Sequence, residues 1–116
     1  MTVTIWHNPR CSKSRQTLEL LRTKGIEPTI REYLKQPPTT GEIAKLIDLL
    51  GGDAANLIRD GEAEFKSMGR KKAELSKAEI ANAIAEHPIL LQRPIVVAGA
   101  RAAIGRPPEA VLALLK

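Results

Sequence analysis

The sequence predicts an α/β fold in which a βαβ unit, a block of helices and a ββα unit follow one another. Short apolar runs rich in β-branched residues, at positions 3–6 and 95–98, are typical of buried strands. Between these strands, two Ser/Thr-x-x-Glu signals mark helix starts at Thr39 and Ser76. At 116 residues the chain has the size of about one domain.

The first third of the chain predicts a strand, a helix and a second strand. Residues 3–6 form the first strand, and the apolar spacing of residues 12–24 predicts a helix that ends at Gly25. Residues 29–33 form the second strand. A strand–helix–strand unit of this length predicts a parallel pair joined by a crossover helix.

The middle of the chain predicts an inserted block of helices. A capping box starts a helix at residues 39–50, and Asp53 caps a short helix that ends before Gly61. The polar stretch 62–74 is interpreted as a loop, and another helix runs over residues 76–88. We therefore expect a helical insertion at about residues 38–87 within a single domain that spans residues 1–116.

The last third predicts a hairpin and a helix. The runs 95–98 and 102–104 flank Gly99 closely enough to pair as antiparallel strands, and Pro107 suits the first position of a final helix. βαβ followed by ββα is the order of the thioredoxin-like three-layer core. The expected fold is therefore that core with the helical insertion.

Composition excludes several classes of site. With one cysteine the chain forms no internal disulfide and no multi-thiolate metal site, and we expect no bound metal. The first residues lack the apolar core of a signal peptide, and no apolar run reaches the length of a membrane span. These features favour a reducing cytoplasm and no membrane partner.

The net charge of +5 favours a small anion as partner rather than nucleic acid. The basic residues are scattered, with a single run at positions 70–72. One Phe, one Tyr and one Trp offer few surfaces on which bases could stack.

The single cysteine, Cys11, is the best candidate for chemistry. It lies between a strand and a helix, beside Arg10 and Lys13, where helix amides and cations stabilise a thiolate. An inert buried cysteine is the alternative. Ser14 stands at the second position of a C-x-x-C spacing, so its hydroxyl can donate a hydrogen bond to the thiolate but cannot resolve a disulfide. Redox chemistry at Cys11 therefore needs an external thiol.

Other residues could support Cys11. A cysteine phosphatase loop would place an arginine where Thr17 stands, so an anion must be bound by arginines elsewhere. Arg93 and Arg106 precede prolines at the ends of predicted elements, and Arg59 ends the short inserted helix. A guanidinium matches a tetrahedral oxyanion through paired hydrogen bonds. His7 suits an orienting or electrostatic role, and the fold predicts a cis peptide bond before Pro94.

Three segments resemble the glutaredoxin-linked arsenate reductase family. Residues 7–15, followed by Thr17-Leu18, are similar to the family's active-site loop. Residues 93–97 and 105–109 are similar to two further segments, and the likeness extends over essentially the whole chain, including Pro28 and the Tyr33-Leu34 pair.

The resemblance implies a thioredoxin-like fold and an arsenate reductase that serves arsenic detoxification. Cys11 would attack arsenate held by Arg59, Arg93 and Arg106, with His7 and Ser14 in support. Glutathione, a co-substrate rather than a bound cofactor, and glutaredoxin would then complete reduction to arsenite.

Two other functions remain open. One is a glutathione-dependent thiol oxidoreductase that acts on another substrate, again through Cys11. The other is a non-enzymatic, thiol-sensing regulator that binds RNA polymerase. Such regulators typically use a C-x-x-C switch, which Ser14 interrupts here.

Overall fold

The computed structural model describes residues 2–51 and 54–115 and confirms the predicted α/β, thioredoxin-like class of fold. The chain divides into two compact units. The first unit combines the N-terminal part up to Gln36 with the C-terminal part from Arg93, and the second comprises Pro37–Gln92. The second unit occupies the place of the expected helical insertion and extends it to Gln92. The organisation as a single domain stays a prediction.

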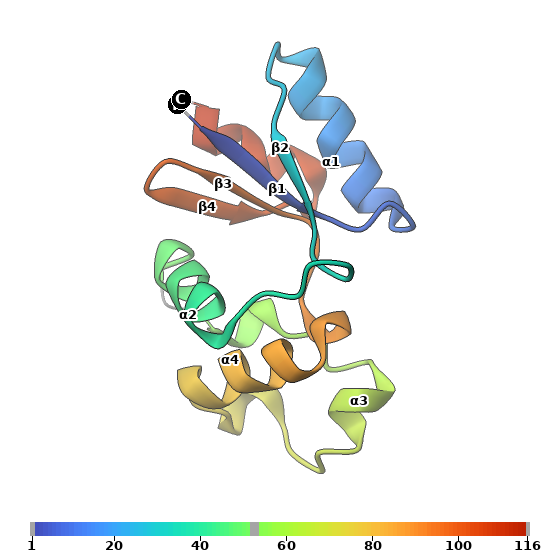
Figure 1. Ribbon diagram of the computed structural model, residues 1–116, viewed down its shortest axis with the longest axis vertical. Helices are drawn as coiled ribbons and strands as arrows, with labels where there is room; N and C mark the ends of the chain where they lie inside the picture. The colour runs from blue at the N-terminus through green and yellow to red at the C-terminus, as the bar shows by residue number, and fades with distance from the viewer. Residues whose placement is uncertain (1, 52–53, 116) are drawn as a thin grey trace. The chain divides into compact units, whose positions relative to one another are not determined.

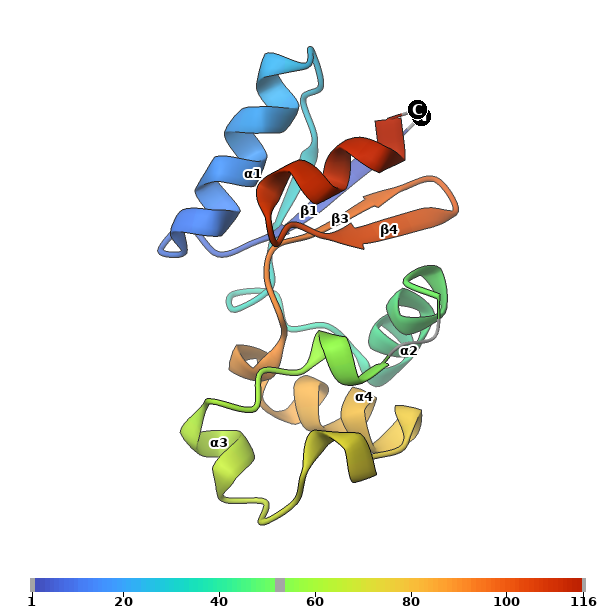
Figure 2. The ribbon, with the colours of Figure 1, turned by 180° about the vertical axis from the view of Figure 1, so that it is seen from behind.

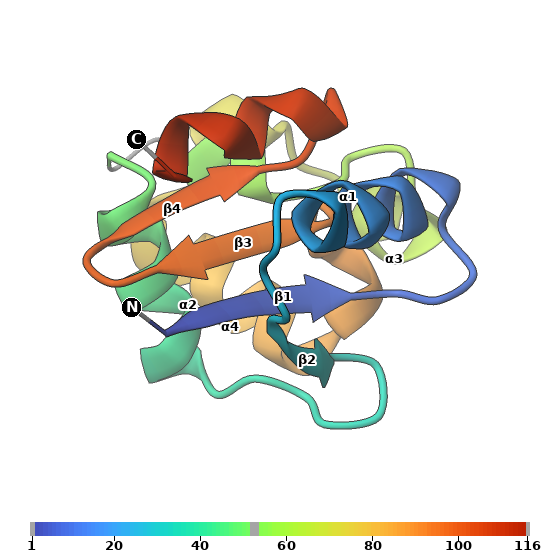
Figure 3. The same cartoon turned by 90° about the horizontal axis from the view of Figure 1, so that it is seen from above.

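The first unit is built on a four-stranded sheet with the order β2-β1-β3-β4. Figure 3 shows these strands, β1 (Val3–His7), β2 (Thr29–Glu32), β3 (Ile95–Ala98) and β4 (Arg101–Ile104). β1 and β2 are parallel, as the crossover connection predicts, whereas β3 is antiparallel to both β1 and β4. The predicted βαβ unit and hairpin are therefore both present.

The strand register brings four chain segments to one edge of the sheet. His7 at the end of β1 pairs with Glu32 at the end of β2. Ile95 at the start of β3 pairs with both Trp6 and Ile104. The segments that follow β1, β2 and β4, and the residue that precedes β3, therefore meet at the same edge.

Two helices cover one face of this sheet. They are α1 (Ser12–Thr23) and the 3-10 helix η4 (Pro108–Leu115), which lie on the same side in Figures 2 and 3. Fully burying an aliphatic side chain contributes about 1.5–3 kcal/mol, so the shared apolar layer stabilises this arrangement. Its buried members come from β1, α1, β3 and η4, and they are Val3, Ile5, Leu18, Leu21, Val96, Ala98, Val111 and Leu114.

Glycines with positive φ occur where the sequence predicts breaks. Gly25, with φ of 79°, follows the last turn of α1, and Gly99, with φ of 61°, lies in the turn between β3 and β4. Glycine adopts this left-handed region without the steric cost that a Cβ imposes.

The second unit is helical (Figure 1). Its longest helices, α2 and α4, pack against each other. No helix in the described parts of the chain is long and apolar enough to cross a membrane. The elements of this unit are α2 (Thr40–Leu49), η1 (Ala54–Leu57), α3 (Ala63–Lys66), η2 (Lys72–Glu74), α4 (Lys77–Glu86) and η3 (Pro88–Leu90).

Both predicted capping boxes are confirmed. Thr39 Oγ1 accepts a hydrogen bond from Glu42 N at 3.1 Å, and Glu42 Oε1 accepts one from Thr39 N at 3.0 Å. The reciprocal bonds between Ser76 and Glu79 measure 3.1 and 2.9 Å. These bonds satisfy amides that the first helical turn leaves without partners, which fixes where α2 and α4 begin.

Two local predictions were wrong, and one lies outside the described residues. The stretch 62–74 contains α3 and η2 rather than only a loop, because Phe65 is buried and anchors a helical turn in otherwise polar sequence. The last helix begins at Pro108, not Pro107, since Pro107 O accepts a hydrogen bond from Ala110 N and so flanks the helix. The expected cap at Asp53 falls outside the described residues.

Candidate active site

Cys11 is the N-cap residue of α1 and is 8% exposed. Its backbone is extended, with φ of −94° and ψ of 122°. Its amide donates a hydrogen bond to Asn8 O at 2.9 Å, and its carbonyl accepts one from Arg15 N at 3.0 Å. The loop after β1 thus holds the thiol at the positive end of the helix dipole, where an anion is stabilised.

The surroundings of Cys11 favour its ionised form. Burial of the thiol raises its pKa, but the Ser14 amide, the Arg93 guanidinium and the Lys13 amide together outweigh burial and lower that pKa below its ordinary value. The two amides belong to the first turn of α1, which has no intrahelical partner for them. The site therefore holds a nucleophilic thiolate at a lower pH than a free cysteine would.

Arg106 lies directly against the sulfur. Its Nη2 is 3.7 Å from Cys11 Sγ, and its Nε donates a hydrogen bond to Arg93 O at 2.6 Å. The second bond fixes the plane of the guanidinium, so one edge of Arg106 faces the thiol. The arrangement supplies positive charge and hydrogen-bond donors at the place where an anionic substrate of Cys11 would lie.

The sheet register explains why two distant arginines reach one cysteine. Arg93 precedes β3 and Arg106 follows β4, and both positions lie at the sheet edge from which the Cys11 loop emerges. The Arg93–Pro94 peptide bond is cis, as expected, and the Arg106–Pro107 bond is cis as well.

Gly105 packs tightly just before Arg106. Its amide donates a hydrogen bond to Pro94 O at 2.8 Å. A Cβ added there would lie 2.7 Å from Thr17 Oγ1 and 2.8 Å from Pro94 Cγ, closer than real Cβ contacts come. The absence of a Cβ at Gly105 therefore allows α1 and the segment before β3 to pack closely against the residue that precedes Arg106.

His7 and Ser14 form a buried pair beneath the cysteine loop. His7 Nδ1 and Ser14 Oγ are 2.6 Å apart, and Asn8 N donates a hydrogen bond to the same Oγ at 3.1 Å. Burial is the main cause of a lowered pKa for His7, so the imidazole stays neutral at physiological pH. These hydrogen bonds stabilise the loop between β1 and α1. Ser14 lowers the pKa of Cys11 through its amide, whereas the sequence predicted a bond from its hydroxyl.

Arg59 belongs to the second unit. Its Nη1 lies 2.6 Å from Glu62 Oε1, and its amide donates a hydrogen bond to Leu90 O at 2.7 Å. A neighbouring bridge pairs Ile58 with Leu91, two residues before Arg93. The assignment of Arg59 to the oxyanion site stays a prediction, as do the substrate-binding roles of Arg93 and Arg106.

The sequence did not single out Tyr33 as a functional residue. It follows β2 directly and is fully buried, and both the Arg93 and Cys11 charges act on its hydroxyl. The signal that could have found it is its position at the end of β2. That end lies beside the end of β1, from which the Cys11 loop emerges.

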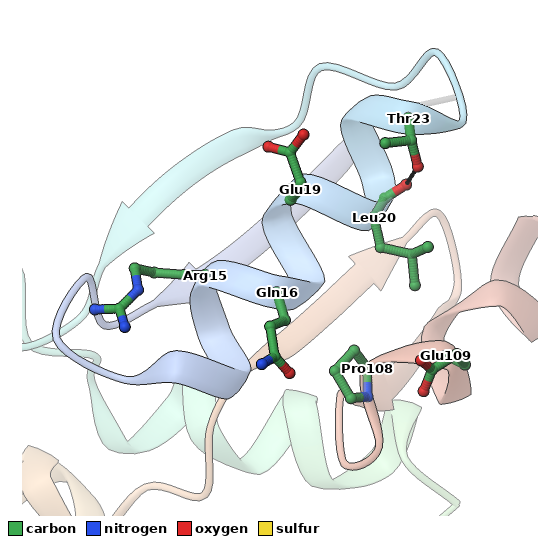
Figure 4. Close-up of a pocket in the computed structure, with 7 residues that line it drawn as sticks. All are labelled: Arg15, Gln16, Glu19, Leu20, Thr23, Pro108 and Glu109. Atoms are coloured by element: carbon green, nitrogen blue, oxygen red, sulfur yellow. Dashed lines mark hydrogen bonds between the residues drawn. The ribbon is translucent and has the colours of Figure 1, made fainter.

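A separate pocket of about 570 Å³ lies beside α1 (Figure 4), and Cys11 is not among the residues that line it. Gln16 and Leu20 lie on the side of α1 nearer Pro108, whereas Arg15 projects away from it. The pocket therefore does not gather cations around a common point, and we do not assign the oxyanion site to it. Its lining residues are Arg15, Gln16, Glu19, Leu20, Thr23, Pro108 and Glu109.

Comparison with known proteins shows similarity along the whole chain. The family model described as "ArsC family" matches residues 6–114. A Haemophilus influenzae protein named "Arsenate reductase" is 46% identical over 99% of this chain and 100% of its own length. An Escherichia coli protein named "Uncharacterized protein YfgD" is 43% identical over 97% of this chain and 96% of its own.

A solved structure agrees with these matches. The structure described as "Arsenate reductase from Vibrio cholerae" has a TM-score of 0.92 and 43% sequence identity. The alignment covers 98% of each chain, so the likeness includes the sheet, its covering helices and the inserted unit. With the family model matching nearly every residue and relatives above 40% identity, this chain belongs to the ArsC family.

Proposed function

We propose that this protein is an arsenate reductase in which Cys11 is the nucleophile. The observation that carries the proposal is the thiol at the N-terminus of α1, with Arg106 Nη2 3.7 Å from its sulfur and Arg93 lowering its pKa. Relatives that share 40% or more of the sequence over most of their length bear the name arsenate reductase. Arsenate is a tetrahedral oxyanion, which matches the donors around Cys11.

The first step joins sulfur to arsenic. The Cys11 thiolate attacks As(V) and an oxygen leaves as water after protonation, so a thiol–arsenate adduct forms without a change in oxidation state. The proposed ligands Arg59, Arg93 and Arg106 balance the charge of the oxyanion. Such preorganised donors stabilise charge in the transition state more than water does.

The second half of the reaction needs thiols from outside the protein, because Cys11 is the single cysteine of the chain. We propose that glutathione and a glutaredoxin thiol supply the two electrons that convert As(V) to As(III). Arsenite leaves, the two external thiols end as a mixed disulfide, and Cys11 regains its thiolate. Glutathione is then a co-substrate, and the need for reduced thiols fits the cytoplasm.

The test is arsenate-dependent NADPH oxidation coupled through glutathione, glutathione reductase and glutaredoxin. We expect turnover with the wild-type protein and none with Cys11→Ser, which keeps the shape of the side chain but loses the thiolate. Omitting glutaredoxin or glutathione separately shows whether both thiols are required. Ser67→Ala, which removes an exposed hydroxyl in the second unit, is the matched control and should match the wild type.

Two results would contradict the proposal. Wild-type protein that gives no arsenate-dependent oxidation with all components present is not an arsenate reductase. Equal turnover with Cys11→Ser would show that the thiol is not the nucleophile.

A further inference from the structure

We propose that the Tyr33 hydroxyl donates a hydrogen bond to the oxyanion that binds at Cys11, so that a phenol joins the arginines as a substrate ligand. The inference rests on the proposed function and adds to it a neutral donor from the residue that follows β2. It is drawn from the position, burial and hydrogen-bonding state of this one side chain.

Tyr33 lies at the sheet edge that carries the cysteine loop. It follows Glu32, the residue of β2 that pairs with His7 of β1, so Tyr33 stands level with Asn8 at the start of that loop. The Arg93 guanidinium and the Cys11 sulfur both act electrostatically on the phenol. The hydroxyl therefore lies near both the nucleophile and an arginine of the site.

The hydroxyl is buried without a hydrogen-bond partner. Tyr33 has no exposed surface, and its oxygen makes no hydrogen bond of acceptable geometry within the described residues. The side chains of Asn8 and Arg93 lie close enough to favour its ionised form, but neither completes such a bond. A buried hydroxyl left without a partner destabilises the fold, and a phenylalanine at this position would avoid that cost.

The neighbouring arginine cannot receive the phenolic proton, because a guanidinium carries only donors. An arsenate oxygen is a strong acceptor, so a bound oxyanion would give this proton a partner. Burial of Tyr33 raises its pKa to about 12, so the phenol keeps its proton throughout the neutral range. Tyr33 therefore offers a donor that does not add charge to the site.

The experiment compares wild-type protein with Tyr33→Phe, which removes the hydroxyl and keeps the ring. Arsenate is titrated as a protectant against alkylation of Cys11 by iodoacetamide, and steady-state kcat and KM are measured in the coupled assay. Thr23→Val removes a hydroxyl at the other end of α1, where it donates to Leu20 O, and serves as control. Thermal unfolding is recorded for all three proteins.

We expect Tyr33→Phe to lower kcat/KM by about tenfold or more and to weaken arsenate protection in parallel, since a hydrogen bond to a charged group is lost. Its Tm should equal or exceed that of the wild type, because an unsatisfied buried group has been removed. Thr23→Val should match the wild type in kcat/KM and in protection.

The outcomes separate this inference from the proposed function. If the wild-type protein is active and Tyr33→Phe equals it in kcat/KM and in arsenate protection, the role of Tyr33 is overturned and the proposed function stands. A parallel loss of activity and Tm in Tyr33→Phe would also overturn it, since the hydroxyl would then be structural. Wild-type protein that neither turns over nor binds arsenate would overturn both.

Discussion

At the scale of single residues, the lowered pKa of Cys11 results from opposing effects on one thiol. Burial disfavours the thiolate, while two amides of the first helical turn and the Arg93 guanidinium favour it and prevail. A helix N-terminus alone is a common feature. The additional presence of Arg93, which precedes β3, distinguishes this cysteine from an ordinary buried thiol.

This balance predicts a pH-dependent reactivity that Arg93 controls. Because the pKa of Cys11 is lowered, its alkylation rate should rise with pH around a midpoint below that of a free cysteine. Arg93→Ala removes a cation that favours the thiolate, so the midpoint should move to higher pH. Arg101→Ala, an exposed arginine at the far end of the hairpin, should leave it unchanged.

The measurement is the rate of iodoacetamide alkylation against pH for the three proteins. A wild-type midpoint at the free-cysteine value would show that the site does not activate the thiol. Identical midpoints in wild type and Arg93→Ala would show that Arg93 does not contribute to the activation.

At the scale of secondary-structure elements, the register of a short hairpin assembles the site. Ile95 pairs with Ile104, so the arginines that flank β3 and β4 come to the same end of the sheet. Gly105 then allows close packing against Thr17 of α1 and against Pro94. This packing fixes the position of α1, whose N-cap residue is Cys11, relative to the segment after β4 that contains Arg106.

Gly105→Ala should disturb this contact. The new Cβ would overlap Thr17 and Pro94, and overpacking of this kind costs about 1–3 kcal/mol of stability. Because the displaced residue adjoins Arg106, kcat/KM for arsenate should fall by about tenfold, the value of one lost hydrogen bond to an anion.

Gly61→Ala is the matched control, since a Cβ at that position meets no atom within 4 Å and its φ is not positive. Thermal unfolding and the coupled assay check both variants. If Gly105→Ala has wild-type kinetics, then the function of Arg106 tolerates the displacement that the new Cβ causes.

At the scale of the whole molecule, Arg59 lies in the second unit, and its role in oxyanion binding is a prediction from the sequence. The bridge between Ile58 and Leu91 ties Arg59 to the segment that leads into Arg93. Glu62 is the ion-pair partner of Arg59, and a bound arsenate would replace this carboxylate.

Arg59→Ala should raise the KM for arsenate by about tenfold or more while leaving the Tm nearly unchanged. Loss of the partly exposed pair with Glu62 costs little, because such ion pairs contribute about 0–1 kcal/mol. Arg70→Ala breaks a similar pair with Glu79 in the same unit and should have wild-type kinetics. A KM in Arg59→Ala equal to that of the control would remove Arg59 from the site.

Much of the fold follows from local sequence signals. The capping boxes at Thr39 and Ser76, the break at Gly25 and the hairpin around Gly99 all lie where the sequence places them. The error in the stretch 62–74 arose where a single side chain overrides local composition. Phe65 is the example, because its burial turns a polar stretch into a helical turn.

The sequence by itself determined the candidate nucleophile, the absence of a second cysteine that could resolve its adducts, and the candidate arginines, because residue types and spacing within a few positions carry that information. Only the tertiary structure decided which of these groups meet. Arg106 reaches Cys11 across 95 positions, and Tyr33 joins them with an unpartnered hydroxyl. Such contacts depend on strand register and on close packing at Gly105, which are properties of the folded chain as a whole.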